Sequence, residues 1–164
     1  MNTKILARIA AVAAIYLVLT ITFAPFSYGP IQVRVSEALT VLPYFFPIAV
    51  PGLFIGCLLA NIFGGYGLID IAFGSLATLL AAYLTRKMPH WLLAPLPPVL
   101  VNAVVVGLML RFVAGFPLVP SMLWVGLGQV VACYGLGLPL LYFLQRRKVI
   151  DGGNEKQPQD QSDL

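Results

Sequence analysis

Residues 28–47, YGPIQVRVSEALTVLPYFFP, place two opposite charges, Arg34 and Glu37, in a chain that is otherwise strongly apolar. The apolar run that follows, residues 38–63, contains Pro43, Pro47 and Pro51. Because proline interrupts helical hydrogen bonding, this run forms either one kinked helix or two short ones. The choice between these two decides the direction of every later helix in the chain.

The composition of the chain defines its class. Of the 164 residues 60% are hydrophobic and 10% are charged, and the mean hydropathy is +0.92. These values are typical of an integral membrane protein, so we expect a lipid bilayer around the chain. The net charge of +4 does not indicate a nucleic-acid partner. The basic residues form short clusters beside apolar runs, which is the pattern of membrane orientation signals.

The basic clusters also decide the number of helices. Candidate spans lie near residues 5–24, 35–46, 48–63, 68–85, 91–113 and 119–144. The clusters are Lys4 and Arg8, then Arg86 and Lys87, then Arg146, Arg147 and Lys148. Only two separate helices between residues 34 and 63 put all three clusters on the cytoplasmic side, as the positive-inside rule requires. The sequence therefore predicts an all-α membrane domain over residues 1–148, with six transmembrane helices, cytoplasmic termini and a polar, disordered cytoplasmic tail over residues 149–164.

Within the predicted helices only two acidic residues occur, Glu37 and Asp70. The predicted topology places the strongly polar side chains mainly in the outer half of the membrane: Arg34, Glu37, Asn61, Asp70, Asn102 and Arg111, with Gln129 near mid-membrane. An unpaired charge in a membrane helix costs about 3 kcal/mol on insertion scales, so such residues face a protein interior or a wet cavity. We interpret this set as a pocket open to the outside. The alternative is that Arg34 and Glu37, three residues apart, pair with each other near the interface.

Other motifs exclude some functions and suggest a packing face. The segment IFGGYG (residues 62–67) has no following Lys-Ser/Thr, so it is not a phosphate-binding loop. Cys57 and Cys133 have no metal-like spacing to His90, and we expect neither an enzyme nor a cofactor. A stripe of small residues on the first helix, formed by Ala7, Ala11 and Ala14 and widened by Ala10 and Ala13, allows close approach of another helix, within the chain or on a partner.

Residues 28–47 together with GLFIGCLLANIFGGYGLIDIAFGSLATLLAAYLTRK (residues 52–87) resemble the QueT family of queuosine-precursor transporters, which are substrate-capture (S) components of energy-coupling-factor (ECF) transporters. The likeness runs over about residues 5–148. It implies a six-helix S component of a prokaryotic plasma membrane, which would bind a vitamin-like compound outside. A transmembrane coupling protein and two cytoplasmic ATPases would drive uptake. It also implies that Ala7 and Ala11, with Ala10 and Ala14 as alternatives, contact the coupling protein.

The ligand that this resemblance implies is a deazaguanine base, and the polar residues suit it. Glu37 can accept two hydrogen bonds from its donor edge, and Asp70 can neutralise an aminomethyl cation. Which carboxylate faces which end of the base stays open. The expected amide contacts are Asn61, Asn102 and Gln129, and the expected stacking surfaces are Phe26, Tyr28, Tyr66 and Trp124. The alternatives are an S component for another vitamin and a stand-alone secondary transporter of a small polar compound.

Overall fold

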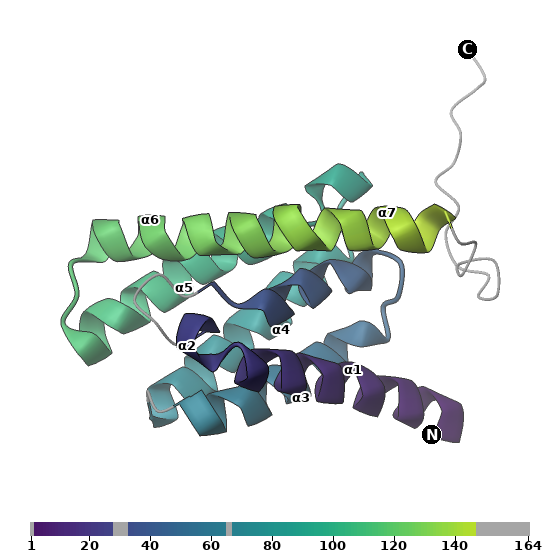
Figure 1. Cartoon of the computed structure of the whole chain (residues 1–164), viewed down its shortest axis with the longest axis horizontal. Helices are drawn as coiled ribbons and strands as arrows, with labels where there is room; N and C mark the ends of the chain where they lie inside the picture. The colour runs from purple at the N-terminus through teal and green to yellow at the C-terminus, as the bar shows by residue number, and fades with distance from the viewer. Residues whose placement is uncertain (1, 28–32, 65–66, 147–164) are drawn as a thin grey trace, which may run out of the picture.

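The computed structural model describes residues 2–27, 33–64 and 67–146, and in these ranges the chain is helical without a strand (Figure 1). The predicted all-α class is therefore confirmed. Tyr28, Tyr66 and the predicted tail, residues 149–164, lie outside the described residues.

The first half of the chain contains α1 (Thr3–Thr22), the short α2 (Ala24–Ser27), η1 (Val35–Tyr44) and α3 (Ala49–Gly64). Asn2 caps α1, since its side chain accepts from the backbone N–H of Lys4. The prediction of two separate helices in residues 34–63 is confirmed, because η1 and α3 are distinct segments. Pro47 lies between them, and Pro51 lies in the first turn of α3, where a missing N–H costs no helical hydrogen bond.

The segment η1 differs from the regular helix that the sequence predicts over residues 35–46. It is a ten-residue 3₁₀ helix that contains Pro43. The hydroxyl of Thr40 donates to the carbonyl of Glu37, three residues earlier, at 2.6 Å. Proline and a local side-chain bond of this kind both compete with the α-helical ladder, which accounts for the tighter and shorter segment.

The second half of the chain contains helices that are continued by π-helical or 3₁₀ segments. η2 (Asp70–Gly74) is a π-helical turn that continues into α4 (Ser75–Thr85). After η3 (Trp91–Leu93), α5 (Leu96–Ala114) ends at Gly115, whose φ of 70° is easily adopted by glycine. The last helix consists of α6 (Leu118–Gln129), the π-helical η4 (Val130–Gly137) and α7 (Leu138–Arg146).

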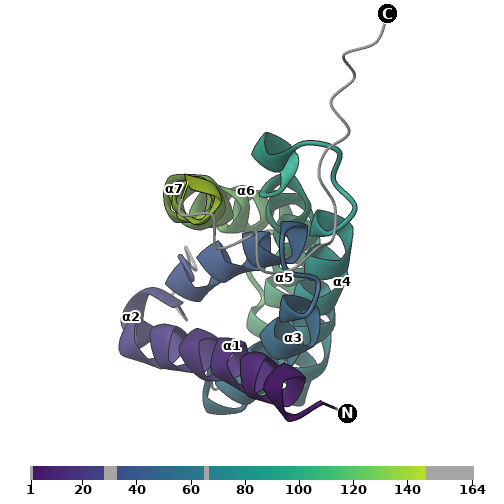
Figure 2. The same cartoon turned by 90° about the vertical axis from the view of Figure 1, so that its right-hand side faces the viewer.

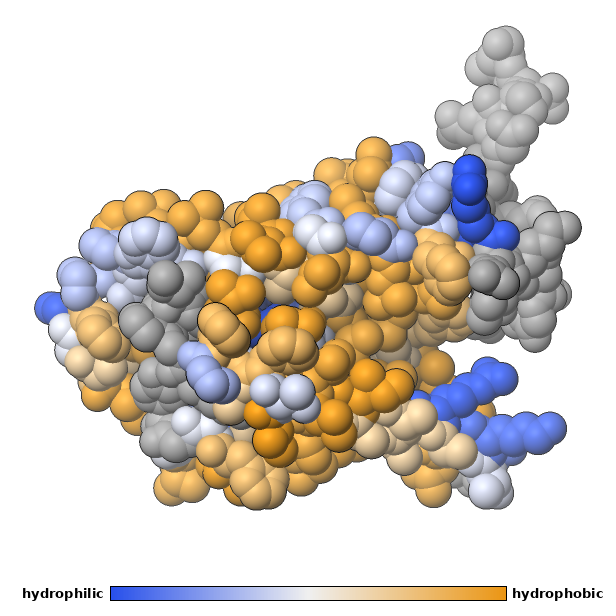
Figure 3. Space-filling view, in the orientation of Figure 1, coloured by the Kyte–Doolittle hydropathy of each residue, from blue (hydrophilic) through white to orange (hydrophobic). Residues whose placement is uncertain are grey.

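Among the described residues, three apolar helical stretches are long enough to cross a membrane: Thr3–Thr22, Trp91–Ala114 and Leu118–Arg146. The apolar helices Ala49–Gly64 and Asp70–Thr85 are shorter. Figure 3 shows a face that is hydrophobic over most of its area, with strongly hydrophilic atoms gathered at one end. α1 begins and α7 ends at the same end of the bundle (Figure 1). The count of six spans and the side of the membrane on which the termini lie stay predictions.

Glycines bring α1 and α3 together. A Cβ on Gly56 would lie 2.8 Å from the carbonyl oxygen of Ala13 and from the Cβ of Tyr16, so this contact needs glycine. The buried face of α1 consists of Ala13, Tyr16 and Thr20. Of the predicted alanine stripe only Ala13 belongs to this face, since the side chains of Ala7, Ala10, Ala11 and Ala14 are exposed. Figure 2 shows α1 at the periphery of the bundle, beside α3.

Candidate ligand-binding site

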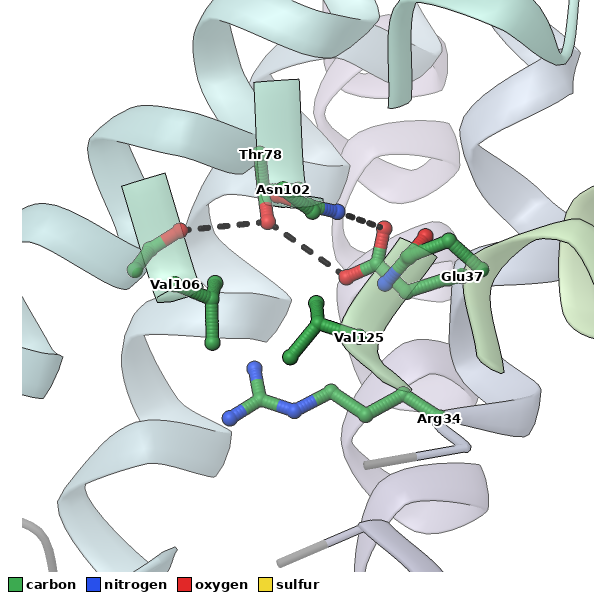
Figure 4. A pocket seen from close by; sticks show the side chains of 8 residues that line it. Arg34, Glu37, Thr78, Asn102, Val106 and Val125 are labelled. Carbon is green, nitrogen blue, oxygen red and sulfur yellow. Dashed lines mark hydrogen bonds between the residues drawn. The ribbon is translucent and has the colours of Figure 1, made fainter. Parts of the chain in front are cut away.

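The candidate site is built around the carboxylate of Glu37, a side chain on η1 that is only 1% exposed. It accepts hydrogen bonds from groups on three other helices. The hydroxyl of Tyr16 on α1 donates to Oε1, the hydroxyl of Thr78 on α4 lies 3.5 Å from the same oxygen, and Nδ2 of Asn102 on α5 donates to Oε2 at 3.2 Å (Figure 4). Surrounding donors of this kind suit an ionised carboxylate, which can only accept.

Arg34 holds a second charge in the site. Its Nη2 lies 3.8 Å from Oδ2 of Asp70, and both side chains are buried. Its Nε donates to the carbonyl oxygen of Ser27 at 3.4 Å. Arg34 and Glu37 are thus both buried. The arginine joins the start of η1 to η2 through Asp70.

Asn61 and Asp70 occupy space that Gly74 leaves free. Nδ2 of Asn61 donates to the backbone carbonyl of Asp70 at 3.1 Å and lies 3.4 Å from the hydroxyl of Ser75. A Cβ on Gly74 would lie 2.8 Å from both Nδ2 of Asn61 and Oδ1 of Asp70. A real side chain at this position would displace one of these polar groups. A glycine at position 74 therefore leaves room for the amide of Asn61 and the carboxylate of Asp70 next to the site.

Both π-helical segments adjoin the site. Asp70 and Gly74 are the ends of η2, and Gln129 directly precedes η4. Sγ of Cys133 in η4 lies 3.4 Å from Oε1 of Gln129 and 3.4 Å from the backbone oxygen of Glu37. π-helical turns are rare and often occur at functional sites, because the wider turn redirects the side chains that follow it.

The carboxylate faces a small cavity whose lining residues come from five helical segments: Arg34, Glu37, Gly74, Thr78, Asn102, Val106, Val125 and Gln129. The cavity volume is about 10 Å³. This is the space that one water molecule occupies. A planar base is much larger, so a ligand of that size could enter only if the walls of the cavity separated, and we call the arrangement seen here the closed form of the cavity.

The structure brings together most of the residues that the sequence indicates. Arg34, Glu37, Asn102 and Gln129 line the cavity, and Asn61 and Asp70 lie next to it. Trp124 lies elsewhere. It is 50% exposed and lines a separate hollow of about 200 Å³ with Phe116, Pro117, Pro120 and Ser121. Phe26 is 66% exposed, while Tyr28 and Tyr66 lie outside the described residues.

Four polar contacts of the site were missed by the sequence analysis: Tyr16, Thr78, Cys57 and Cys133. The sequence analysis considered the two cysteines only as metal ligands, but both are buried in contact with polar atoms, and Sγ of Cys57 lies 3.2 Å from the hydroxyl of Thr78. A helical spacing of four residues links several of these positions to predicted ones: Cys57 to Asn61, Asp70 through Gly74 to Thr78, and Gln129 to Cys133. This spacing is the signal that could have identified Cys57, Thr78 and Cys133.

Comparisons with known proteins agree with a transport role. The sequence model of the QueT transporter family matches residues 6–146. A relative from Lactococcus lactis subsp. cremoris, named Queuosine precursor transporter QueT, is 40% identical over 80 residues, which is 48% of this chain and 47% of the relative. The chain thus aligns with about half the length of this relative. No solved structure matches the chain.

The family match covers most of the chain, and its residues include every segment that contributes to the Glu37 cavity. The family consists of transporters, not enzymes, and several apolar helices of this chain are suited to a multi-pass membrane protein. The chain belongs to the QueT transporter family.

Proposed function

We propose that the chain is the substrate-capture (S) component of an ECF-type ABC importer and that it binds a queuosine precursor, a deazaguanine base, from outside the cell. The family and the name of the Lactococcus relative support the class of ligand. The observation that carries the proposal is the buried carboxylate of Glu37, which faces a cavity and is surrounded by neutral hydrogen-bond donors.

The chemistry of the site supports a ligand with a donor edge. A ring N–H and an exocyclic amine that point the same way match the two oxygens of a carboxylate. In the closed form Thr78 and Asn102 contact these oxygens from the cavity wall, so the ligand would replace them. The amides of Asn102 and Gln129 can then bind the carbonyl and ring nitrogens of the base. Asp70 lies next to Gly74, which lines the cavity. Its carboxylate can meet a positive group of the ligand if Arg34, with which it forms an ion pair, moves away.

The proposed topology has six membrane segments with both termini in the cytoplasm of a prokaryote, and the site opens to the outside. Basic residues near both described ends and in the turn after α4 support it, since Arg8, Arg86, Lys87 and Arg146 are all exposed. η1 is too short to cross a bilayer alone. It lies among other helices, where a short segment with irregular backbone is tolerated.

The proposed partners are a transmembrane coupling protein and two cytoplasmic ATPases. The chain has no phosphate-binding loop, so active uptake needs an external source of energy. The exposed stripe of Ala7, Ala10, Ala11 and Ala14 on α1 is a surface that another membrane helix can approach closely. Its exposure favours a partner over packing within the chain.

A binding screen tests the proposal. The purified full chain in nanodiscs is titrated calorimetrically with a deazaguanine base, riboflavin, thiamin and biotin. Saturable binding of the deazaguanine alone is expected. Tight binding of one of the vitamins would assign the chain to another S-component specificity. Uptake of the base into vesicles that contain only this chain would instead identify a stand-alone secondary transporter.

A further inference from the structure

Tyr16 contacts the carboxylate of Glu37 but does not line the cavity. Its side chain is 0% exposed and packs in the apolar cluster that includes Leu53, Cys57 and Ala82. Its hydroxyl donates to Oε1 of Glu37. Tyr16 is not among the residues that line the cavity, whereas Glu37 is. A ligand in the cavity would therefore meet the carboxylate without touching Tyr16.

The other two donors differ from Tyr16 in this respect. Thr78 and Asn102 line the cavity and contact the oxygens of Glu37 at 3.5 Å and 3.2 Å. A ligand that donates to both oxygens of Glu37 must take the site on Oε1 that Thr78 occupies in the closed form, and it competes with Asn102 for Oε2. A carboxylate offers about four lone-pair sites, so Oε1 can keep the bond from Tyr16 while it accepts from the ligand.

We propose that Tyr16 is a positioning residue for ligand binding, which holds the carboxylate of Glu37 in one orientation while the donors on the cavity wall give way to the ligand. This inference rests on the proposed role of Glu37 as ligand acceptor. The terminal torsion of a glutamate is broad and soft, so a buried donor on one oxygen restricts the rotation of the carboxylate. A group that is already oriented loses less freedom on binding, which raises affinity.

Thr20 provides a matched control on the same helix, one turn after Tyr16. Its hydroxyl is buried and makes hydrogen bonds to Oγ of Ser36 at 2.7 Å and to the backbone oxygen of Tyr16 at 2.8 Å. It therefore also joins α1 to η1. Thr20→Val removes the hydrogen bond between α1 and η1, while the carboxylate of Glu37 keeps its bonds from Tyr16, Thr78 and Asn102. The variant therefore measures how a looser contact between α1 and η1 affects ligand binding.

The experiment measures deazaguanine affinity by calorimetry on the full chain for Tyr16→Phe, Thr20→Val, Glu37→Gln and the double variant Tyr16→Phe/Glu37→Gln. Tyr16→Phe is expected to weaken binding about tenfold, at the lower end of the effect of a hydrogen bond to a charged group. Thr20→Val is expected to bind like the parent. In the Glu37→Gln background Tyr16→Phe is expected to cause no further loss, because it acts through the carboxylate.

Glu37→Asp gives a second test that does not depend on the folding of Tyr16→Phe. It keeps the charge but withdraws the carboxylate from Tyr16 by one methylene, so about a tenfold loss is expected. The inference is overturned if Tyr16→Phe or Glu37→Asp binds the base like the parent while Glu37→Gln binds it more weakly. It is also overturned if Thr20→Val lowers the affinity as much as Tyr16→Phe does. An equal loss of affinity from Tyr16→Phe in the parent and in the Glu37→Gln variant would overturn it as well. Parent-like binding by Glu37→Gln would instead refute the role of Glu37 as ligand acceptor, on which this inference rests, and absence of deazaguanine binding by the parent would refute the proposed function itself.

Discussion

The guanidinium of Arg34 and the carboxylate of Asp70 form an ion pair between η1 and η2, with 3.8 Å between Nη2 and Oδ2 and with side chains that are 5% and 0% exposed. A buried pair of this kind contributes little net stability, but loss of one partner leaves a buried charge without compensation. The pair therefore constrains the two segments that flank the candidate site.

Asp70→Asn is expected to destabilise the ligand-free protein by about 3 kcal/mol, because the charge of Arg34 stays buried after the carboxylate is gone. The measurement is thermal unfolding of the purified chain in detergent. Arg34→Met/Asp70→Asn should recover part of the loss, since neither charge remains. A double variant that is as unstable as the sum of both single variants would show that the pair is not energetically coupled.

Gly74→Ala is expected to destabilise the protein by about 1–3 kcal/mol, since its Cβ would overlap polar atoms of Asn61 and Asp70 that have little room to move. Gly135→Ala is the matched control. It also lies in a π-helical segment, and a Cβ there would meet no heavy atom within 4 Å. Equal unfolding temperatures for the two variants would contradict the tight packing around Gly74.

The proposed topology predicts opposite labelling of two turns. Cys57 and Cys133 are buried, so an added surface cysteine dominates the reaction with a membrane-impermeant thiol reagent. His90→Cys, in the exposed turn between α4 and α5, should react only from the cytoplasmic side. Phe116→Cys, in the turn between α5 and α6, should react only from outside. Labelling of both from the same side would refute the arrangement of α5 in the membrane.

Ala11→Leu and Ala7→Leu are expected to weaken assembly with the coupling protein at least tenfold while ligand affinity stays within about twofold, because a contact between small residues tolerates little added volume. Ala72→Leu adds the same volume at an exposed position of η2 and serves as the control. Co-purification of the complex measures assembly. If no variant among Ala7, Ala10, Ala11 and Ala14 affects the complex, the stripe is not the contact.

Much of the fold could be predicted from the sequence, because bilayer length, charge asymmetry and proline positions act locally along the chain. The separation of η1 from α3 is an example. The 3₁₀ geometry of η1 was not predicted, although Pro43 indicates a disturbed helix, because the bond from Thr40 to the carbonyl of Glu37 is seen only in the structure.

The site was predictable only in part. Buried polar residues are rare enough in an apolar chain to indicate Glu37, Arg34, Asn102 and Gln129, which line one cavity. Their partners were not indicated. Tyr16 has a side chain that is common in membrane helices, so only its contact with Glu37 distinguishes it, whereas Thr78 could have been found by its helical spacing from Asp70. The pairing of Arg34 with Asp70 also depends on tertiary packing, because no rule of helical spacing joins η1 to η2.

The affinity of Glu37→Gln for a deazaguanine base tests the central claim most directly. This substitution keeps the shape of the side chain but replaces one acceptor oxygen by a donor, which would face the N–H groups of the ligand. Arg111→Gln, which removes an exposed charge on α5, is the control. We predict that Glu37→Gln, in folded protein of equal yield, binds about ten- to a hundredfold more weakly than the parent and that Arg111→Gln binds normally. Equal affinities of Glu37→Gln and the parent would show that the carboxylate serves only the fold.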